Sequence, residues 1–240
     1  MTGNLNPDTA IRHYNCLDST NEEARRLSRA GETGPLWIAA RRQTAGRGRR
    51  GRSWVSGEGN LFATLLISAP QPNSSQLAFV AALACAETIA HYAPKSRVTL
   101  KWPNDVLLEG KKVCGILLEG LGNGALAIGI GINIAQFPAG TEYPATSLDK
   151  VTGRGAPPDE ALAILARTMS AWYDVWREAG FARVRDAWLA RAGGLGQNIR
   201  ARLEKGEMTG IFEGLDEDGA LMLRTGTGTL TRIAAGDVFL

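Results

Sequence analysis

The 240-residue sequence has few of the side chains that build metal centres or covalent catalytic sites. It contains two histidines, His13 and His91, and three widely spaced cysteines, Cys16, Cys85 and Cys114, with no CxxC pair. A structural zinc site needs several Cys or His ligands close together, and a disulfide framework needs paired cysteines. We therefore expect the cysteines to be free structural thiols. Neither histidine has neighbouring residues in the sequence that would complete a Ser/His/Asp or Cys/His catalytic set.

Long apolar segments are also missing. No charge-free apolar run reaches roughly 18 residues, and the N-terminus lacks the basic, apolar and small-residue order of a secretion signal. The hydrophobic fraction of 44% and the charged fraction of 21% are close to globular averages. A chain of this length buries roughly 70–75% of its unfolded surface. We therefore expect a cytoplasmic globular protein with a substantial core.

The net charge of +3 comes from one short segment. Residues 41–52 contain six arginines and no acidic residue, so the remaining 21 basic residues face 24 acidic ones, a balance of −3. Proteins that follow a nucleic acid usually spread Lys and Arg over a face or groove. The confinement of the charge disfavours a single-stranded nucleic-acid-binding module but leaves it open as an alternative.

Glycines alternate with arginines in the segment QTAGRGRRGRSW, residues 43–54. Gly46, Gly48 and Gly51 allow backbone N–H groups to turn toward a bound anion, and the guanidinium groups add rigid paired donors. Crowded like charges with nothing apolar to bury predict a loop that is mobile alone and ordered when it closes over an anion. Trp54 is expected to stack on a flat ligand or, as a structural alternative, to anchor the end of the loop.

The periodicity of the remaining sequence predicts an α+β domain followed by a small β domain. Thr20 and Glu23 have capping-box spacing at the start of the first helix. The expected helices cover residues 20–29, 74–92, 158–179 and 181–191. The expected strands cover residues 37–40, 61–67, 97–102, 106–108, 113–118 and 125–134, and then 199–203, 209–215, 220–223 and 229–233. We therefore expect a mixed β-sheet covered by helices in residues 1–192 and a small β-barrel in residues 193–240.

Five short motifs occur between Asp18 and Asn133. They are DSTN at 18–21, GRGRRGR at 46–52, KWPND at 101–105, KKVCGIL at 111–117 and GIGIN at 129–133. In this order and spacing they resemble the signature of the biotin protein ligases. The resemblance implies a class II synthetase-like catalytic domain with a C-terminal SH3-like barrel. Some bacterial members of that family carry an N-terminal DNA-binding domain and act as repressors, but only 17 residues precede Asp18, so we expect a ligase without specific DNA binding.

The resemblance also implies the chemistry. Biotin protein ligases are ATP-dependent, AMP-forming enzymes in which the biotin carboxylate attacks the α-phosphate of ATP, giving biotinyl-5′-AMP and pyrophosphate. A lysine of a biotin carboxyl carrier protein or domain then attacks the acyl carbon and releases AMP. This chemistry needs no enzyme nucleophile, and Mg²⁺ accompanies the ATP to neutralise its phosphates. The sequence leaves open whether an edge strand pairs two subunits as a homodimer or docks the carrier domain.

By motif position, the resemblance implies roles for fifteen residues. The implied biotin-binding residues are Ser19, Thr20, Asn21, Gln43, Arg47, Gly48, Arg49, Lys112 and Gly115. The implied nucleotide-binding residues are Arg52, Trp54, Asn104, Lys112 and Asn133. The implied catalytic residues are Arg49, Lys112, Lys101 and Asp105. The cations are expected to offset the repulsion between carboxylate and triphosphate, and Asp105 is a candidate for orienting magnesium, whose ligands stay unassigned.

Some of these assignments have alternatives. Thr20 has a second interpretation as a helix cap, and Lys101 has one as the partner of a nearby acid. The alternative enzyme is a lipoate or octanoyl-type carrier-acylating protein, which shares the general fold by family resemblance. That class lacks the GRGRRGR loop, and its acyl transferases need a reactive Cys or Lys instead of ATP.

Overall fold

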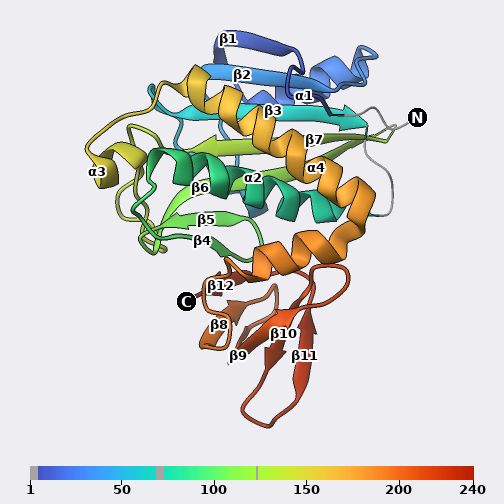
Figure 1. The fold of residues 1–240 in the computed structure, drawn as a ribbon, viewed down its shortest axis with the longest axis vertical. Helices are drawn as coiled ribbons and strands as arrows, with labels where there is room; N and C mark the ends of the chain where they lie inside the picture. Colours follow the sequence, from blue (N-terminus) through green and yellow to red (C-terminus); the bar gives the residue numbers. More distant parts are fainter. Residues whose placement is uncertain (1–4, 69–72, 123) are drawn as a thin grey trace.

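The computed structural model describes residues 5–68, 73–122 and 124–240. A seven-stranded sheet with helices on both faces forms the larger part of the molecule, and a five-stranded sheet lies at one end of it (Figure 1). Among the helices of these residues, none combines the length and the apolar character that a membrane crossing requires.

The seven-stranded sheet is mixed, as the sequence predicts. Its order is β1-β2-β3-β7-β6-β5-β4, in which β1 and β2 are parallel and the other neighbours are antiparallel. The strands are β1 (Ile11–Leu17), β2 (Leu36–Gln43), β3 (Leu61–Ser68), β4 (Val98–Lys101), β5 (Asp105–Leu108), β6 (Lys111–Gly122) and β7 (Ala125–Ile132). Glu109 and Gly110 close the β5–β6 hairpin with φ of 50° and 73°, the signs that a two-residue I′ turn needs.

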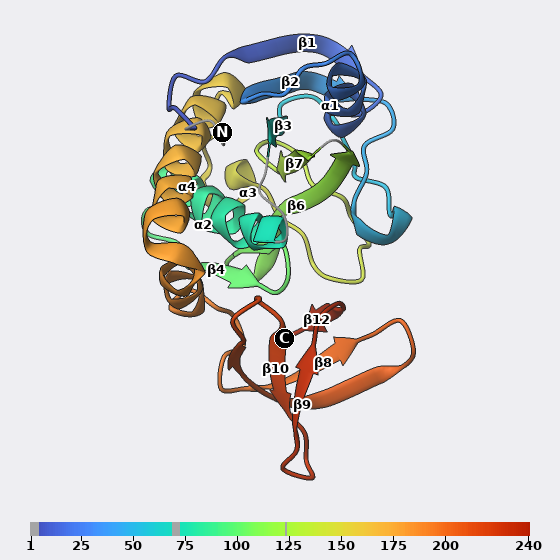
Figure 2. The same cartoon turned by 90° about the vertical axis from the view of Figure 1, so that its right-hand side faces the viewer.

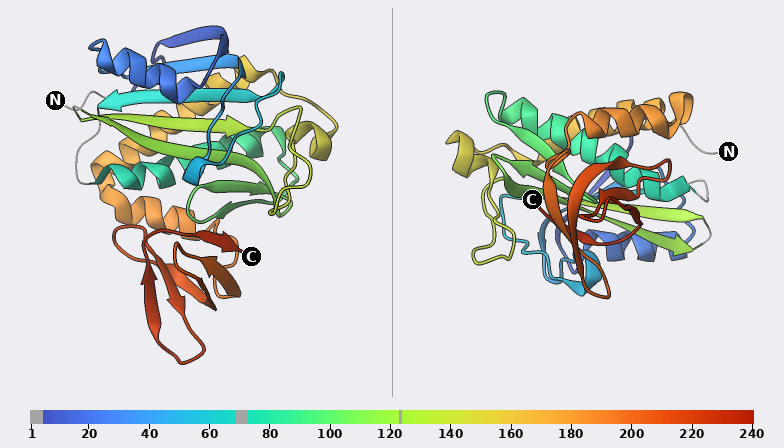
Figure 3. Two further views of the ribbon diagram at one scale, coloured as in Figure 1. Left: turned by 180° about the vertical axis from the view of Figure 1, so that it is seen from behind. Right: turned by 90° about the horizontal axis from the view of Figure 1, so that it is seen from below.

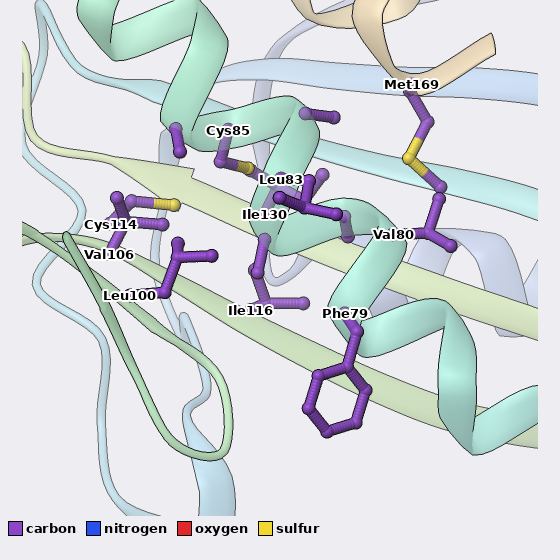
Figure 4. Packing of buried hydrophobic residues seen from close by; sticks show 14 of the residues in the cluster. Phe79, Val80, Leu83, Cys85, Leu100, Val106, Cys114, Ile116, Ile130 and Met169 are labelled. Carbon is purple, nitrogen blue, oxygen red and sulfur yellow. The ribbon is translucent and has the colours of Figure 1, made fainter. Parts of the chain in front are cut away.

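Successive side chains of the central strands point to opposite faces and build two apolar clusters. One face is covered by α2 (Leu77–Tyr92) and α4 (Pro158–Leu189), and Figure 4 shows Leu83 and Phe79 of α2 in the same cluster as the strand residues Ile116 and Ile130. The other face carries α1 (Thr20–Arg29), which buries Ala24 in a much smaller cluster. This less filled face is the one on which the functional site lies.

The C-terminal sheet is antiparallel, with the order β11-β10-β9-β8-β12. Its strands are β8 (Asn198–Arg202), β9 (Glu207–Leu215), β10 (Leu221–Arg224), β11 (Leu230–Ile233) and β12 (Asp237–Phe239).

Gly180 interrupts α4 with φ of 75°, so the two predicted helices are present as two helical segments. Trp102 Nε1 donates to Gly219 O at 3.0 Å and links the two parts of the molecule, and the left view in Figure 3 shows the C-terminal sheet at one end of the large sheet. The division into domains at residues 192 and 193 stays a prediction.

Two local features differ from expectation. The capping box is wrong, because Ser19 occupies the N-cap position and Glu23 bonds Tyr14 and Arg26 instead. The sequence also failed to predict β1, β12 and α3 (Leu148–Thr152). Strand β1 lies at the sheet edge with a mostly exposed pattern, and β12 is three residues long, so neither produces a clear alternation of apolar and polar residues.

Candidate active site

A cavity of about 460 Å³ lies on the α1 face of the large sheet. This volume falls within the roughly 300–1,000 Å³ of small-molecule sites. All fifteen residues to which the sequence assigns roles line it, namely Ser19, Thr20, Asn21, Gln43, Arg47, Gly48, Arg49, Arg52, Trp54, Lys101, Asn104, Asp105, Lys112, Gly115 and Asn133. Figure 2 shows the arginine-rich loop between β2 and β3 on the side of the sheet opposite α2 and α4. The structure thus brings distant motifs together, while the individual roles stay predictions.

Uncharged side chains form one end of the cavity. Gln43 Oε1 accepts from the backbone N and Oγ1 of Thr20 at 2.8 and 3.2 Å, and Gln43 Nε2 donates to Ser56 Oγ at 3.0 Å. The buried Thr64 Oγ1 lies 2.6 Å from Asn21 Oδ1 and 2.8 Å from Thr20 Oγ1. Because an amide oxygen only accepts, the single Thr64 proton goes to Asn21, and the single proton of the Thr20 hydroxyl is shared between Thr64 Oγ1 and Gln43 Oε1. Thr20 is therefore held by side chains of the sheet and does not act as a helix cap.

The amide of Asn21 is oriented by charged neighbours. Its Nδ2 donates to Glu119 Oε2 at 2.7 Å and to Leu117 O at 3.4 Å. Arg25 Nη2 in turn bonds Glu119 Oε1 at 3.3 Å. Gly129 leaves room for this arrangement, since a Cβ there would collide with the Asn21 amide. Asn21 thus has its donors occupied and keeps acceptor capacity on Oδ1.

The opposite end is cationic and is organised around Asp105. Its carboxylate is 10% exposed and lies 2.9 Å from Lys101 Nζ and 2.6 Å from Lys112 Nζ. Burial alone would raise the pKa of Asp105, but the two lysines outweigh burial and hold that pKa below its ordinary value. Lys101 also donates to Val238 O at 3.2 Å and lies 4.4 Å from the centre of the Tyr143 ring. The alternative for Lys101, an ion pair with a nearby acid, is therefore confirmed.

The arginine-rich loop points its guanidinium groups at protein acceptors. Arg49 Nη1 donates to Asn104 Oδ1 at 3.2 Å and to Gly236 O at 3.3 Å, and burial lowers the pKa of Arg49. Arg52 Nη2 lies 3.1 Å from Asp237 Oδ1, while the exposed Arg47 Nη1 lies 2.8 Å from Glu22 on α1. Backbone bonds from Gly48 N to Arg52 O and from Trp54 N to Gly46 O shape the loop. Its mobility without ligand stays a prediction.

The indole of Trp54 lies directly on two glycine-bearing strands. A Cβ on Gly115 of β6 would be 2.7 Å from Trp54 Cζ3, and a Cβ on Gly131 of β7 would be 2.6 Å from Trp54 Cε2. Lys112 Nζ lies 5.4 Å from the centre of the indole ring. Trp54 thus anchors the end of the loop, as the structural alternative predicts. Its stacking on adenine stays a prediction.

The two asparagines assigned to the nucleotide, Asn104 and Asn133, differ in whether their side-chain amides still have a free hydrogen-bond acceptor. Asn104 bonds Arg49 with Oδ1 and donates from Nδ2 to Ile116 O at 2.6 Å, so it positions Arg49. Asn133 is 2% exposed and donates from Nδ2 to Thr146 O at 3.1 Å. Its buried Oδ1 has no hydrogen-bond partner among the described residues. An orphaned buried acceptor at a cavity wall is a position where a ligand donor is stabilised.

Several contributing residues were missed by sequence reasoning. Thr64 lies within the apolar strand LFATLLIS, where a polar side chain between apolar neighbours was the available signal. Glu119 follows the KKVCGIL motif by two residues, and its role depends on a contact with α1. Asp237 and Val238 come from β12, more than 130 residues from their partners Arg52 and Lys101. No local pattern in the sequence predicts that these distant segments are in contact.

The described residues contain no group of three or more His, Cys, Asp or Glu side chains that could hold a metal. Both oxygens of Asp105 are paired with lysines. The donors present therefore do not form a resident magnesium cage.

Comparison with known proteins agrees with this geometry. The Biotin/lipoate A/B protein ligase family matches residues 14–134, and the Biotin protein ligase C terminal domain matches residues 194–240. The chain is 47% identical over 235 residues to the Biotin--[acetyl-CoA-carboxylase] ligase of Paracoccus denitrificans, covering 92% of this chain and 97% of the relative. It is 33% identical to the Bifunctional ligase/repressor BirA of Bacillus subtilis, covering 95% of this chain and 73% of that protein.

Solved structures give the same result. The biotin protein ligase of Aquifex aeolicus in complex with biotin and ATP superposes with a TM-score of 0.84 at 31% identity, covering 96% of this chain and 97% of that one. The five motifs, the cavity that they line and these similarities all support the same family assignment. The chain belongs to the biotin/lipoate A/B protein ligase family and, within it, to the ATP-dependent biotin protein ligases.

Proposed function

We propose that biotin lies along the cavity, with its ureido ring at the uncharged end and its carboxylate at the cationic end. The single observation that supports this most strongly is the separation of charge along one cavity, from Thr20 and Asn21 to Lys112 and Arg49. Asn21 Oδ1 accepts from a ureido N–H, because its donors are already committed to Glu119 and Leu117. Few, well-placed polar groups of this kind fix the orientation of a small ligand.

In the first step, a biotin carboxylate oxygen forms a bond to the α-phosphorus of ATP, and the bond from that phosphorus to pyrophosphate breaks. Lys112 and Arg49 offset the repulsion between the two anions and stabilise the charge that develops on the phosphoryl oxygens. Lys112 suits this role because it is 26% exposed toward the cavity while Asp105 holds its ammonium group at 2.6 Å. Asn104 keeps Arg49 in place through its contact of 3.2 Å.

At the nucleotide, the unpartnered Asn133 Oδ1 accepts from the exocyclic amino group of adenine. Trp54 stacks on the adenine ring, and Arg52 contacts phosphate. Magnesium enters as part of the MgATP substrate and neutralises phosphate charge when bound. In this proposal Asp105 positions the two lysines, which lie 2.9 and 2.6 Å from its carboxylate, and no contact with magnesium is assigned to it.

In the second step, the amine of an acceptor lysine attacks the acyl carbon and releases AMP. The name of the Paracoccus relative supports the carrier protein of an acetyl-CoA carboxylase as acceptor. We also propose a cytoplasmic location and a ligase that does not act as a repressor. Strand β1 lies at the edge of the large sheet, where the carrier domain or a second subunit can pair with it.

Pyrophosphate release tests this proposal and separates it from the carrier-acylating alternative. The protein with MgATP is expected to release pyrophosphate on addition of biotin and not on addition of lipoate. Release with lipoate alone would favour the alternative enzyme. Nucleic-acid binding is opposed by the distribution of charge, because the excess of arginine is confined to residues 41–52 and the rest of the chain has a balance of −3. A biotin-independent affinity for single-stranded DNA that falls steeply with salt would reverse that conclusion.

A further inference from the structure

The C-terminal sheet supplies an acidic residue to the cationic end of the cavity. Asp237 begins β12, and its side chain is 15% exposed. Its carboxylate lies 3.1 Å from Arg52 Nη2, 3.5 Å from Arg50 Nη1 and 3.8 Å from Arg49 Nη1. One carboxylate thus faces three guanidinium groups of the loop that the proposed function assigns to biotin and ATP.

Two further features show that this contact shapes the loop. Arg50 has φ of 55°, the left-handed region that residues other than glycine rarely adopt. A backbone conformation of this kind persists where surrounding contacts hold it, and the contact to Asp237 is an ion pair of this side chain. The next residues of β12 add backbone acceptors, because Gly236 O accepts from Arg49 and Val238 O accepts from Lys101.

An acid at this position is unfavourable beside a triphosphate. Like charges disfavour each other, and a carboxylate already paired with the arginines competes with incoming phosphate oxygens. Asp105 differs, since it lies between two lysines and holds both. Asp237 is therefore the carboxylate whose pairs must break if the loop arginines are to contact phosphate.

Resting on the proposed function, we infer that Asp237 is a positioning residue that holds the arginine-rich loop against the C-terminal sheet and is displaced by the phosphates of ATP. The carboxylate stands in for phosphate before the nucleotide binds. Binding transfers the guanidinium groups from Asp237 to the nucleotide and loosens β12. The C-terminal sheet in this way sets the affinity of the loop for ATP.

Equilibrium binding of MgATP without biotin tests the competition. Asp237→Asn keeps the shape of the side chain and is expected to bind MgATP about three- to tenfold more tightly than the unmodified protein. Trypsin should also cut the loop faster in this variant before nucleotide is added. The matched control is Glu213→Gln, which removes one negative charge from β9 of the same sheet and breaks an exposed pair with Arg224. Affinity equal to that of the control, or weaker, would overturn the inference.

Hydrogen exchange on the unmodified protein provides a second test that needs no variant. MgATP is expected to slow exchange in residues 46–54 and to speed exchange in residues 236–239, with β10 as the internal reference. Slower exchange in both segments would mean that Asp237 remains engaged, and the inference would be wrong. Pyrophosphate release by the same protein with biotin tests the proposed function separately, so the two failures are distinguishable.

Discussion

Replacing Asp105 by asparagine is expected to destabilise the protein strongly. The substitution keeps the shape of the side chain but removes the charge that faces Lys101, 7% exposed, and Lys112, 26% exposed. Lys101 then retains the carbonyl of Val238 and the face of the Tyr143 ring, neither of which carries a countercharge. Breaking a buried ion pair by removing one partner costs about 3–5 kcal/mol, a large part of a typical stability of roughly 5–15 kcal/mol.

Urea denaturation of Asp105→Asn and of the unmodified protein measures this cost. The control is Asp149→Asn on the short helix α3, where an exposed charge is expected to change the free energy of unfolding by less than about 0.5 kcal/mol. Saturating MgATP should restore part of the loss, because phosphate supplies the missing negative charge and ligand binding adds about 2.7 kcal/mol at a hundredfold excess over Kd. A loss below about 1 kcal/mol would refute the view that Asp105 holds the two lysines in place.

Three further predictions address the site. Lys112→Ala should slow adenylate formation by about 10²–10³-fold in single-turnover quench experiments while preformed adenylate is still transferred, and equal first-step rates would contradict its assigned role. Gly131→Ala should weaken nucleotide binding and shift tryptophan fluorescence, because its Cβ would lie 2.6 Å from the indole of Trp54, which is assigned to the nucleotide. Gly155→Ala, with nothing within 4 Å of its added Cβ, is the control, and indistinguishable behaviour would exclude tight packing at Trp54. Because the pKa of Asp105 is lowered, its pairs stabilise the fold above the unfolded value of about 3.9 and are lost as pH falls through the folded value. The stability gap between the unmodified protein and Asp105→Asn should therefore narrow in acid, and a constant gap would argue against this cause.

Local signals in the sequence were sufficient for much of the fold. The Glu109-Gly110 turn, the apolar run of β3 and the alanine-rich α2 each have a pattern that specifies one element. The edge strand β1 and the short strand β12 depend on tertiary contacts for their formation. Thr20 also shows that local pattern is not sufficient. Its spacing to Glu23 is typical of a helix cap, but its hydroxyl contacts Gln43 and Thr64, which come from β2 and β3.

The site divides in a similar way. Motif residues could be gathered from the sequence because each motif keeps its residue types at fixed spacing. Their partners could not, because the contacts that define them join distant segments, as in Arg52 with Asp237 and Asn21 with Glu119. The division of work between the two nucleotide asparagines also needed geometry, since only the structure shows that Asn104 is committed and Asn133 Oδ1 is not.

The central claim is that one cavity activates biotin with ATP for transfer to a carrier lysine. Mass spectrometry of a purified biotin carboxyl carrier domain, incubated with this protein, biotin and MgATP, tests that claim most directly. We expect a single biotinyl group on one lysine, absent when ATP or biotin is omitted and strongly reduced with Lys112→Ala. A carrier domain of unchanged mass, with the unmodified protein folded and both substrates present, would contradict it.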